Sequence, residues 1–345
     1  MPVRPPEKIL IIRPSALGDV CRSVPVLVSL KRAFPEARVD WLVQDTFADA
    51  VRAHPDLGEV IPFDRSGMGR ASRRGNFGPT WRLAGRLRRG GYHLAVDAQG
   101  LFRSGFFAGA TGAERRVGYR NAREVGWIFY NERYRVDRAL HSVDRMLTLL
   151  ERAGAPRVED MRLYTPEDGR AWVERAYPEL SEGGYAVLAP TSRWIAKQWP
   201  DGRFAALCAR LLTHGVERVV LVGGPGEAAQ CPELCALGKS DDRVVNLIGA
   251  TPISALMAVI ERCDLLVAND SAALHMGVGF DRKLVALYGP TRVDLVGPYR
   301  RDGDVIQHVG PDDPMDHKND AHRSLMERIG VEEVAAACFE RLGAS

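Results

Sequence analysis

The chain has 345 residues, of which 46% are hydrophobic and 26% charged, so it has the composition of a folded protein with room for two domains. That composition excludes a disordered chain, and no apolar run approaches the about 20 residues that a membrane-spanning helix needs. Residues 1–150 carry 25 Lys and Arg against 15 Asp and Glu (+10), whereas the remainder carries 22 against 29 (−7), so we expect the first half to meet an anionic partner.

Short, β-rich apolar runs alternate with amphipathic stretches along the first half of the chain. The apolar runs predict strands at 8–13, 38–43, 59–63, 93–98 and 115–119. The stretches between them predict helices near 23–34, 45–53, 80–89 and 100–110. Short buried strands alternating with helices are typical of a parallel sheet with right-handed crossovers.

The pattern restarts after a polar, proline-bearing stretch at 156–169. It predicts strands at 185–190, 218–223, 244–249, 264–269 and 283–289, and helices near 201–214, 227–238, 253–262 and 271–278, with a closing helix at 331–342. We therefore predict an α/β protein with two Rossmann-like domains, at 1–165 and 180–330, followed by a closing segment at 331–345. Ligands bind beyond the carboxyl ends of parallel strands, so the loops after the strands are the candidate sites.

Two loops of the first half carry candidate site residues. Asp19 follows the first strand in SALGDV, where it serves either as a helix N-cap or as a functional carboxylate. In VDAQGLFRS (96–104), Asp97 and Gln99 can hydrogen-bond a polyhydroxyl substrate, and Arg103 can bind a carboxylate or phosphate through its guanidinium fork. The alternative for Asp97 is that its side chain stabilises the turn itself.

The stretch 65–90 contains eight arginines and no acidic residue. Its glycines and serines predict a mobile loop, and its unpaired charge favours an anionic ligand over a merely solvated surface. Phe77 and Trp81 are the only aromatic residues of the stretch, and no recognition motif accompanies them, so we expect no nucleic-acid partner.

Candidate ligand groups of the second half follow its strands. Thr191, Ser192 and Lys197 lie after the first strand, where a lysine suits a phosphate unless it is an ordinary surface residue. Glu227 in GGPGE can take a ribose hydroxyl pair, or it can be an acid favoured by the helix dipole. In NDSAALH (269–275), a helix start provides free N–H groups for an anion. The residues there are Asp270, Ser271 and, one turn later, His275, while Thr291 in YGPT adds a hydroxyl after the next strand.

Targeting, disulfide and metal patterns are not evident. Residues 1–13 are broken by charges and prolines, unlike a signal peptide. The six cysteines show neither a CxxC pair nor a metal spacing, which indicates free thiols in a reducing, cytosolic compartment, with peripheral membrane association left open. We interpret the DxD at 302–304 and the histidines at 317 and 322 as parts of solvated loops and predict no metal site.

Taken together, these motifs resemble glycosyltransferase family 9, the ADP-heptose:lipopolysaccharide heptosyltransferases. The resemblance rests on SALGDV (15–20), VDAQGLFRS (96–104), AREVGWIFYNERY (122–134), HSVDR (141–145), KQWP (197–200), GGPGE (223–227), NDSAALHM (269–276) and YGPT (288–291). VDAQGL and the segment at 122–134 look most like heptosyltransferase I, which adds the first heptose to Kdo on lipid A. Ala272 departs from the family pattern, which commonly has glycine at that position.

The resemblance implies a GT-B fold and an inverting, metal-independent transfer that needs no cofactor. It implies that Asp19 is the general base and that Lys197 neutralises the leaving ADP. The implied donor contacts are Thr191, Ser192, Glu227, Asp270, Ser271, Ala272, His275 and Thr291. The implied contacts to an anionic, lipid-linked acceptor at the inner membrane surface are Ser15, Gly18, Arg73, Arg74, Asp97, Gln99, Arg103 and Arg123.

Other functions stay open on the sequence. GPGEAA at 224–229 approaches a dinucleotide-binding pattern and would fit a nucleotide-cofactor oxidoreductase, although 244–250 lacks the acid expected after the next strand. Consumption of NAD(P) would identify that activity. A non-catalytic protein that binds sugar nucleotides or polyanions would not need both Asp19 and Lys197. A transferase of another NDP-sugar to a surface glycan would use the same residues, and the sequence predicts no oligomeric state.

Overall fold

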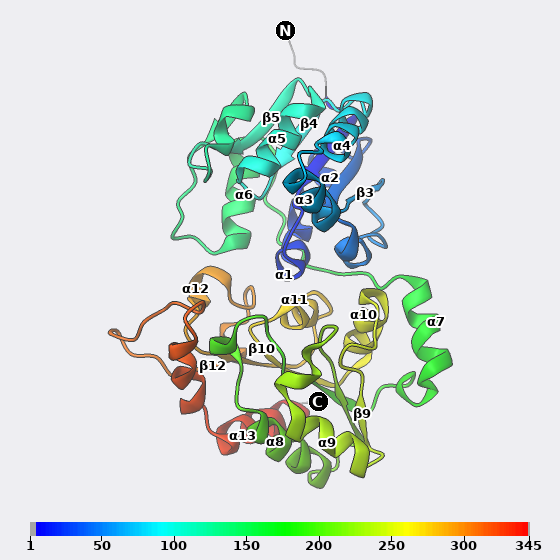
Figure 1. Ribbon diagram of the computed structural model, residues 1–345, viewed down its shortest axis with the longest axis vertical. Coiled ribbons are helices and arrows are strands. Elements are labelled where there is room, and N and C mark those ends of the chain that lie inside the picture. Colours follow the sequence, from blue (N-terminus) through cyan, green and yellow to red (C-terminus); the bar gives the residue numbers. More distant parts are fainter. Residues whose placement is uncertain (1–4, 344–345) are drawn as a thin grey trace. The chain divides into compact units, whose positions relative to one another are not determined.

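The computed structural model describes residues 5–343. The chain divides into two compact units, Met1–Tyr164 and Thr165–Ser345, each with its own sheet (Figure 1). The boundary lies inside the polar stretch 156–169. The helix α7 (Glu167–Ala176), which follows that boundary, packs on α10 (Ile253–Arg262) and so belongs to the second unit.

The first unit is built on a six-stranded parallel sheet in the order β3-β2-β1-β4-β5-β6. β1 (Lys8–Ile12) is buried from Ile9 to Ile12 because a parallel sheet is covered by helices on both faces. The remaining strands are β2 (Arg38–Gln44), β3 (Val60–Phe63), β4 (Leu94–Asp97), β5 (Arg115–Tyr119) and β6 (Glu132–Tyr134). The sequence did not predict β6, a three-residue edge strand.

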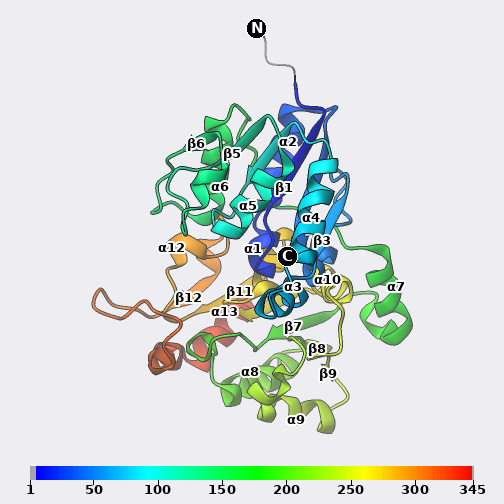
Figure 2. The same ribbon diagram turned by 45° about the horizontal axis from the view of Figure 1, so that its top comes forward.

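Helices cover both faces of this sheet (Figure 2). α2 (Val24–Ala33) packs with α6 (Ser142–Arg152), and α4 (Gly78–Arg89) packs with α5 (Phe102–Thr111). The α4 and α5 side buries Leu10 and Ile12 of β1 against Leu83, Leu87 and Phe107. Shorter elements complete the unit: α1 (Leu17–Cys21), α3 (Arg65–Arg73), and the 3-10 helices η1 (Asp45–Ala50) and η2 (Gly126–Phe129).

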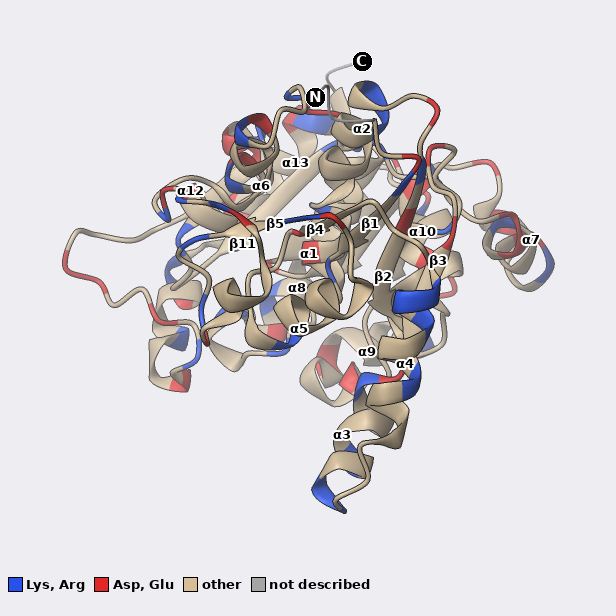
Figure 3. Ribbon diagram, turned by 90° about the horizontal axis from the view of Figure 1, so that it is seen from above, with Lys and Arg blue, Asp and Glu red and all other residues tan. Residues whose placement is uncertain are grey.

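The arginine-rich stretch 65–90 differs in its first part from the mobile loop that the sequence predicted, whereas the helix predicted near 80–89 is present as α4. It forms α3 and α4, which bracket a short turn containing Gly75. Asp64 caps α3 by accepting a hydrogen bond from the N–H of Gly67 at 2.6 Å. Lys and Arg positions, coloured blue on the ribbon in Figure 3, occur along both helices. The positive charge is therefore carried on ordered helices, and its residues have fixed neighbours.

The second unit repeats the architecture with the strand order β12-β11-β10-β7-β8-β9, again all parallel. Its strands are β7 (Tyr185–Ala189), β8 (Arg218–Leu221), β9 (Val244–Asn246), β10 (Leu265–Asn269), β11 (Leu284–Tyr288) and β12 (Val305–Gln307), of which β12 was not predicted. The helices are α8 (Asp201–Thr213), α9 (Pro232–Ser240), α11 (Ala272–Gly279), α12 (Val293–Val296) and α13 (Val331–Gly343). The 3-10 helices are η3 (Pro178–Leu180), η4 (Ile195–Lys197), η5 (Glu227–Gln230), η6 (Asp302–Asp304) and η7 (Asp320–Arg328).

Both sheets have the strand order of a Rossmann fold, with the direction of winding reversed between β1 and β4 and between β7 and β10. Ligands of such folds bind at that reversal, beyond the carboxyl ends of the two central strands. Loops from both central strands therefore meet there in each unit. Over residues 5–343, no helix is both long and apolar enough to cross a bilayer.

Candidate functional site

Asp19 lies in α1, directly beyond the carboxyl end of β1. The N-cap of α1 is Ala16, so Asp19 is not the cap residue that its position after the strand allowed. Its Oδ2 atom does accept a hydrogen bond from the N–H of Ala16, at 3.3 Å. Asp19 thus stabilises the first turn of α1 from within, and its carboxylate stays at the strand end.

Two guanidiniums hold this carboxylate. Oδ1 of Asp19 lies 3.1 Å from Nη2 of Arg13 and 2.5 Å from Nη2 of Arg22. Arg13 also donates to the carbonyl of Ala98 at 2.8 Å, which ties the ends of β1 and β4 together. Burial alone would raise the pKa of Asp19, but Arg13 and Arg22 outweigh it and hold that pKa well below its usual range. Asp19 is therefore ionised at every physiological pH, and 30% of its side chain remains exposed.

Asp97, at the end of β4, has a structural role in place of the expected contact with an acceptor. Its side chain is fully buried. One oxygen accepts hydrogen bonds from the N–H groups of Gln99 and Gly100, at 2.8 and 3.0 Å, and the other accepts from the Tyr130 hydroxyl at 2.5 Å. Burial raises the pKa of this carboxyl group despite these donors. Asp97 thus stabilises the turn and presents no surface to a sugar.

The neighbouring loop residues are better placed to contact a ligand. Gln99 is half-buried, and its Oε1 atom has no hydrogen-bond partner among the described residues. Arg103 is exposed at the start of α5. The hydroxyl of Ser15 accepts from Nη1 of Arg65 at 3.4 Å, so the loop after β1 touches the beginning of α3. Gly18 lies within α1, one residue before Asp19.

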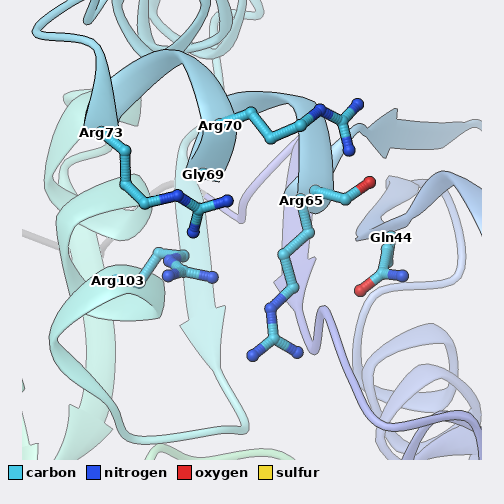
Figure 4. A pocket seen from close by; sticks show the side chains of 7 residues that line it. Gln44, Arg65, Gly69, Arg70, Arg73 and Arg103 are labelled. Atoms are coloured by element: carbon cyan, nitrogen blue, oxygen red, sulfur yellow. The ribbon is translucent and has the colours of Figure 1, made fainter.

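An arginine pocket of about 520 Å³ opens beside this loop cluster (Figure 4). Its lining residues are Gln44, Arg65, Ser66, Gly69, Arg70, Arg73 and Arg103. In Figure 4 the side chain of Arg73 points toward Arg103, and both line the pocket, so an anion held there would offset the repulsion between their like charges. Arg74 and Arg123 are exposed but do not line this pocket. Of Arg73, Arg74 and Arg123, which the resemblance implied as acceptor contacts, only Arg73 therefore belongs to the pocket.

In the second unit, the loops after β7 and β10 meet in an ion pair. Nζ of Lys197 lies 2.6 Å from Oδ2 of Asp270, and both side chains are largely buried. Lys197 ends η4, which follows β7, while Asp270 directly follows β10. Because β7 and β10 are adjacent strands, the reversal of winding brings together two residues that are 73 positions apart in the sequence. Lys197 is therefore fixed at this site and is not an ordinary surface lysine.

Glu227 is held by the loop after β7. Its Oε2 atom accepts hydrogen bonds from the hydroxyl of Thr191 at 2.6 Å and from the N–H of Gly224 at 2.7 Å. Ser192 lies beside Thr191 and donates its hydroxyl to the carbonyl of Asp270 at 3.4 Å. These bonds fix the orientation of the half-buried Glu227 carboxylate, and the segment Thr191–Ser192 connects it to the backbone of Asp270.

The start of α11 provides further donors. Ser271 is its N-cap and Ala272 its first residue, so the position that is commonly glycine in the family needs no glycine conformation here. The hydroxyls of Ser271 and Thr291 are shielded from solvent and have no hydrogen-bond partner among the described residues. His275 lies within α11 and is buried, and its contact with a donor stays a prediction. Unsatisfied hydroxyls beside the free N–H groups of a helix start are suited to an anion.

His317 is a neighbour of this site that the sequence did not identify. Its ring contacts Trp194, with 6.0 Å between centroids. Burial lowers the pKa of His317, and the Lys197 ammonium acts in the same direction, while Asp270 opposes it. No local pattern could have shown this, because His317 lies in a polar segment 123 positions after Trp194 and 47 positions after Asp270. In the DxD segment, Asp304 pairs with Arg301 at 2.5 Å and Arg341 at 3.1 Å.

The fold and the site can be compared with those of known proteins. The model of glycosyltransferase family 9 (heptosyltransferase) matches residues 80–323. Lipopolysaccharide heptosyltransferase 1 of Pseudomonas aeruginosa is 28% identical over 318 residues, 89% of this chain and 84% of the relative. Lipopolysaccharide heptosyltransferase 2 of Salmonella typhimurium is 27% identical over 315 residues, which cover 88% of this chain and 88% of the relative.

The solved structure of Escherichia coli ADP-heptose lipopolysaccharide heptosyltransferase II matches at 24% identity with a TM-score of 0.78, covering 97% of this chain and 98% of that one. The α/β fold of GT-B type, with two Rossmann-like domains, is thereby confirmed.

Proposed function

Because the chain belongs to glycosyltransferase family 9, the heptosyltransferases, we propose that it transfers heptose from an ADP-heptose donor to the Kdo-containing inner core of lipopolysaccharide. The relatives named above include both types 1 and 2, at nearly equal identity. The type that acts first, on Kdo, is the one that the motifs VDAQGL and 122–134 favour. The observation that carries the proposal is the pair of charged sites at the two reversals of winding, one holding Asp19 and the other Lys197.

The second unit is the proposed donor side. Lys197 and the N–H groups at the start of α11 would neutralise the diphosphate, and the unpaired hydroxyls of Ser271 and Thr291 would donate to it. Glu227 has a carboxylate fixed by Thr191 and would take the ribose hydroxyls. Asp270 would orient Lys197, and its negative charge would limit how tightly a product diphosphate is held.

The first unit is the proposed acceptor side. Its excess of positive charge matches an anionic acceptor, and the arginine pocket offers Arg65, Arg73 and Arg103 to a phosphate or carboxylate. Asp19 would accept the proton of the attacking hydroxyl. Because its pKa is depressed, Asp19 is always available as a base but is a weak one, so proton transfer would accompany formation of the new bond.

In the proposed step, the acceptor oxygen attacks the anomeric carbon and the bond from that carbon to the β-phosphate oxygen breaks. The electron pair leaves with ADP, and the hydroxyl proton goes to Asp19. The transition state has oxocarbenium character, which the Asp19 carboxylate also stabilises. Attack from the face opposite the leaving group inverts the anomeric centre. Lys197 and backbone N–H groups supply the charge that a metal would otherwise provide, so we propose a metal-independent reaction.

Nucleotide release with a panel of donors tests this function. We expect ADP release with ADP-heptose to depend on a Kdo-bearing lipid A acceptor, and other NDP-sugars to be poor donors. Comparing that acceptor with one already carrying a first heptose separates type 1 from type 2. Because the acceptor is a membrane lipid, we place the reaction at the cytoplasmic face of the inner membrane. Absence of acceptor-dependent ADP release with every donor would overturn the proposal.

A further inference from the structure

An aromatic groove lies beside the arginine pocket in the first unit. It has a volume of about 510 Å³, and half of its lining residues are aromatic: Phe63, Phe77, Trp81, Phe102, Phe106 and Phe107. The groove and the arginine pocket share Arg65, Gly69 and Arg103, so they are two compartments of one surface depression. A volume in the range of about 300–1,000 Å³ is that of a ligand-binding site.

The rim of this groove exposes large apolar side chains that the core does not use. Trp81 is 65% exposed, Phe77 54% and Phe102 44%. α4 buries Leu83 and Leu87 in the core, and Trp81 projects from a different side of that helix. The Trp81 ring meets Phe106 edge to face, with 6.0 Å between centroids, and so is positioned by the groove floor. Clustered exposed aromatics of this size mark an interaction surface.

The combination of the two compartments defines the chemistry of the ligand. The arginine pocket needs an anion, and the groove beside it needs an apolar chain. Apart from the shared Arg65 and Arg103, the polar side-chain groups of the groove are the hydroxyls of Ser72 and Thr80 and the indole N–H of Trp81, which are too few for a sugar with many hydroxyls. An amphiphile with a phosphate or carboxylate head and an acyl chain would satisfy both compartments at once.

We propose that the aromatic groove binds an acyl chain of the lipid-linked acceptor while the arginine pocket binds a negative group of the same molecule. The proposal rests on the proposed function for the identity of that lipid. It explains why the apolar surface is placed next to the arginines and on the unit that carries Asp19. It also makes acyl-chain recognition a source of acceptor affinity that is separate from the contacts of the sugar.

Binding of hexyl, octyl and decyl phosphate, each below its micelle concentration, tests the groove without turnover. Each added methylene that is fully buried tightens binding by up to about fourfold, so affinity should rise steeply with chain length. In Trp81→Ser and Phe102→Ser the dependence should become shallow. Leu140→Ser removes an exposed apolar residue outside both compartments and should keep the wild-type dependence. Equal affinity across the series, or an unchanged dependence in both groove variants, would overturn the proposal.

A second arm compares an acylated with a deacylated acceptor in the transfer reaction. We expect a lower KM for the acylated acceptor, and the ratio of the two KM values should fall toward one in Trp81→Ser. If the ratio of the two KM values stays at its wild-type value in this variant, the groove does not bind an acyl chain. If both KM values also rise by the same factor, the groove instead stacks on a sugar of the acceptor. Absence of transfer to both acceptors in the wild type would contradict the proposed function. The alkyl phosphate series would still show whether the groove binds an acyl chain.

Discussion

In the first unit, the loop after the central strand β1 holds a carboxylate between two guanidiniums, whereas in the second unit the loop after β7 holds an ammonium against a carboxylate. The strand order around the two loops is the same. A Rossmann sheet therefore fixes where a ligand group lies but not which charge it carries. The short loops decide the charge, and with it the chemistry.

The two sites also differ in how open they are. Lys197 and Asp270 are largely buried, and the hydroxyls of Ser271 and Thr291 beside them are shielded from solvent. The arginines beside the first site line an open surface pocket. A site whose polar groups are shielded from solvent suits the phosphates of a nucleotide, and an open, cationic one suits a large anionic acceptor. Variants on each side should therefore affect different substrates.

The largest expected effect is on the first site. Asp19→Asn keeps a hydrogen-bond acceptor but removes the base, so kcat should fall by about 10²–10⁴-fold while the Kd of ADP stays the same. Arg13 and Arg22 lose their partner, so the Tm should also decrease somewhat, and kcat should be measured well below it. Asp49→Asn, which removes another aspartate that pairs with an arginine in the same unit, should leave kcat unchanged. Normal turnover by Asp19→Asn would exclude Asp19 as the base.

The next largest effect is expected at the second site, where substitutions should weaken nucleotide binding. Lys197→Ala should weaken ADP binding by about 10–100-fold, the value of a charge-assisted hydrogen bond. Because Lys197 contacts Asp270 directly, the effects of Lys197→Ala and Asp270→Asn on the Kd of ADP should not add in the double variant. Calorimetry of the four proteins measures this, with the exposed Lys239→Ala as control. Strict additivity would show that the pair does not act as a unit.

A smaller effect separates two adjacent arginines. Arg73 lines the arginine pocket and Arg74 does not, so Arg73→Glu should raise the KM of a phosphorylated lipid acceptor by several-fold more than Arg74→Glu does. The effect is electrostatic, so added salt should weaken acceptor binding more in the wild type than in Arg73→Glu. KM measured at two salt concentrations tests this. Equal KM values for the two variants would mean that net charge, and not the pocket, attracts the acceptor.

The pH dependence of the first site should shift with its arginines. Asp19 cannot accept a proton once it is protonated, so kcat/KM falls as the pH decreases through its pKa. Since that pKa is depressed, the acid limb due to Asp19 should lie below about pH 3.9, the ordinary value of an Asp. Arg13→Gln should move the limb upward, and Arg52→Gln, a control in the same unit, should not. An acid limb that is the same in Arg13→Gln and the wild type would contradict this electrostatic role.

No effect is expected from chelation. Among residues 5–343, no group of His, Cys, Asp and Glu is arranged to hold a metal ion, and Asp304 of the DxD segment is paired with Arg301 and Arg341. Transfer should therefore proceed at the same rate in EDTA. If chelation abolished activity and Mg²⁺ or Mn²⁺ restored it, a metal ion as well as Lys197 would have to supply the positive charge that neutralises the leaving diphosphate at the second site.

The sequence predicted ten strands because each is a short apolar run bounded by turn residues. It missed β6 and β12, which are three-residue edge strands without such a run. It also missed α3, whose sequence RSGMGRASR is polar and rich in glycine and buries no residue. That helix depends on its Asp64 cap and its tertiary neighbours, and propensity alone does not reveal these.

Site residues were predictable where they follow a strand. Lys197 and Asp270 could each be proposed from their loops, but their ion pair depends on the adjacency of β7 and β10, which only the fold gives. Asp97 shows the opposite case, since its residue type suits a sugar while the turn uses one of its oxygens and the Tyr130 hydroxyl uses the other. His317 and the aromatic groove had no local pattern, because their contacts join segments far apart in the chain.

Each unit encloses a hydrophobic core of its own, one around β1, α4 and α5 and the other around β7, α8 and α13. During synthesis the first unit can therefore fold before the second has left the ribosome, because none of its core residues comes from the later half. Once the chain is complete, a nucleotide that binds the native protein raises its stability by mass action. Because the second unit is the proposed nucleotide side, added ADP should protect that unit directly against unfolding.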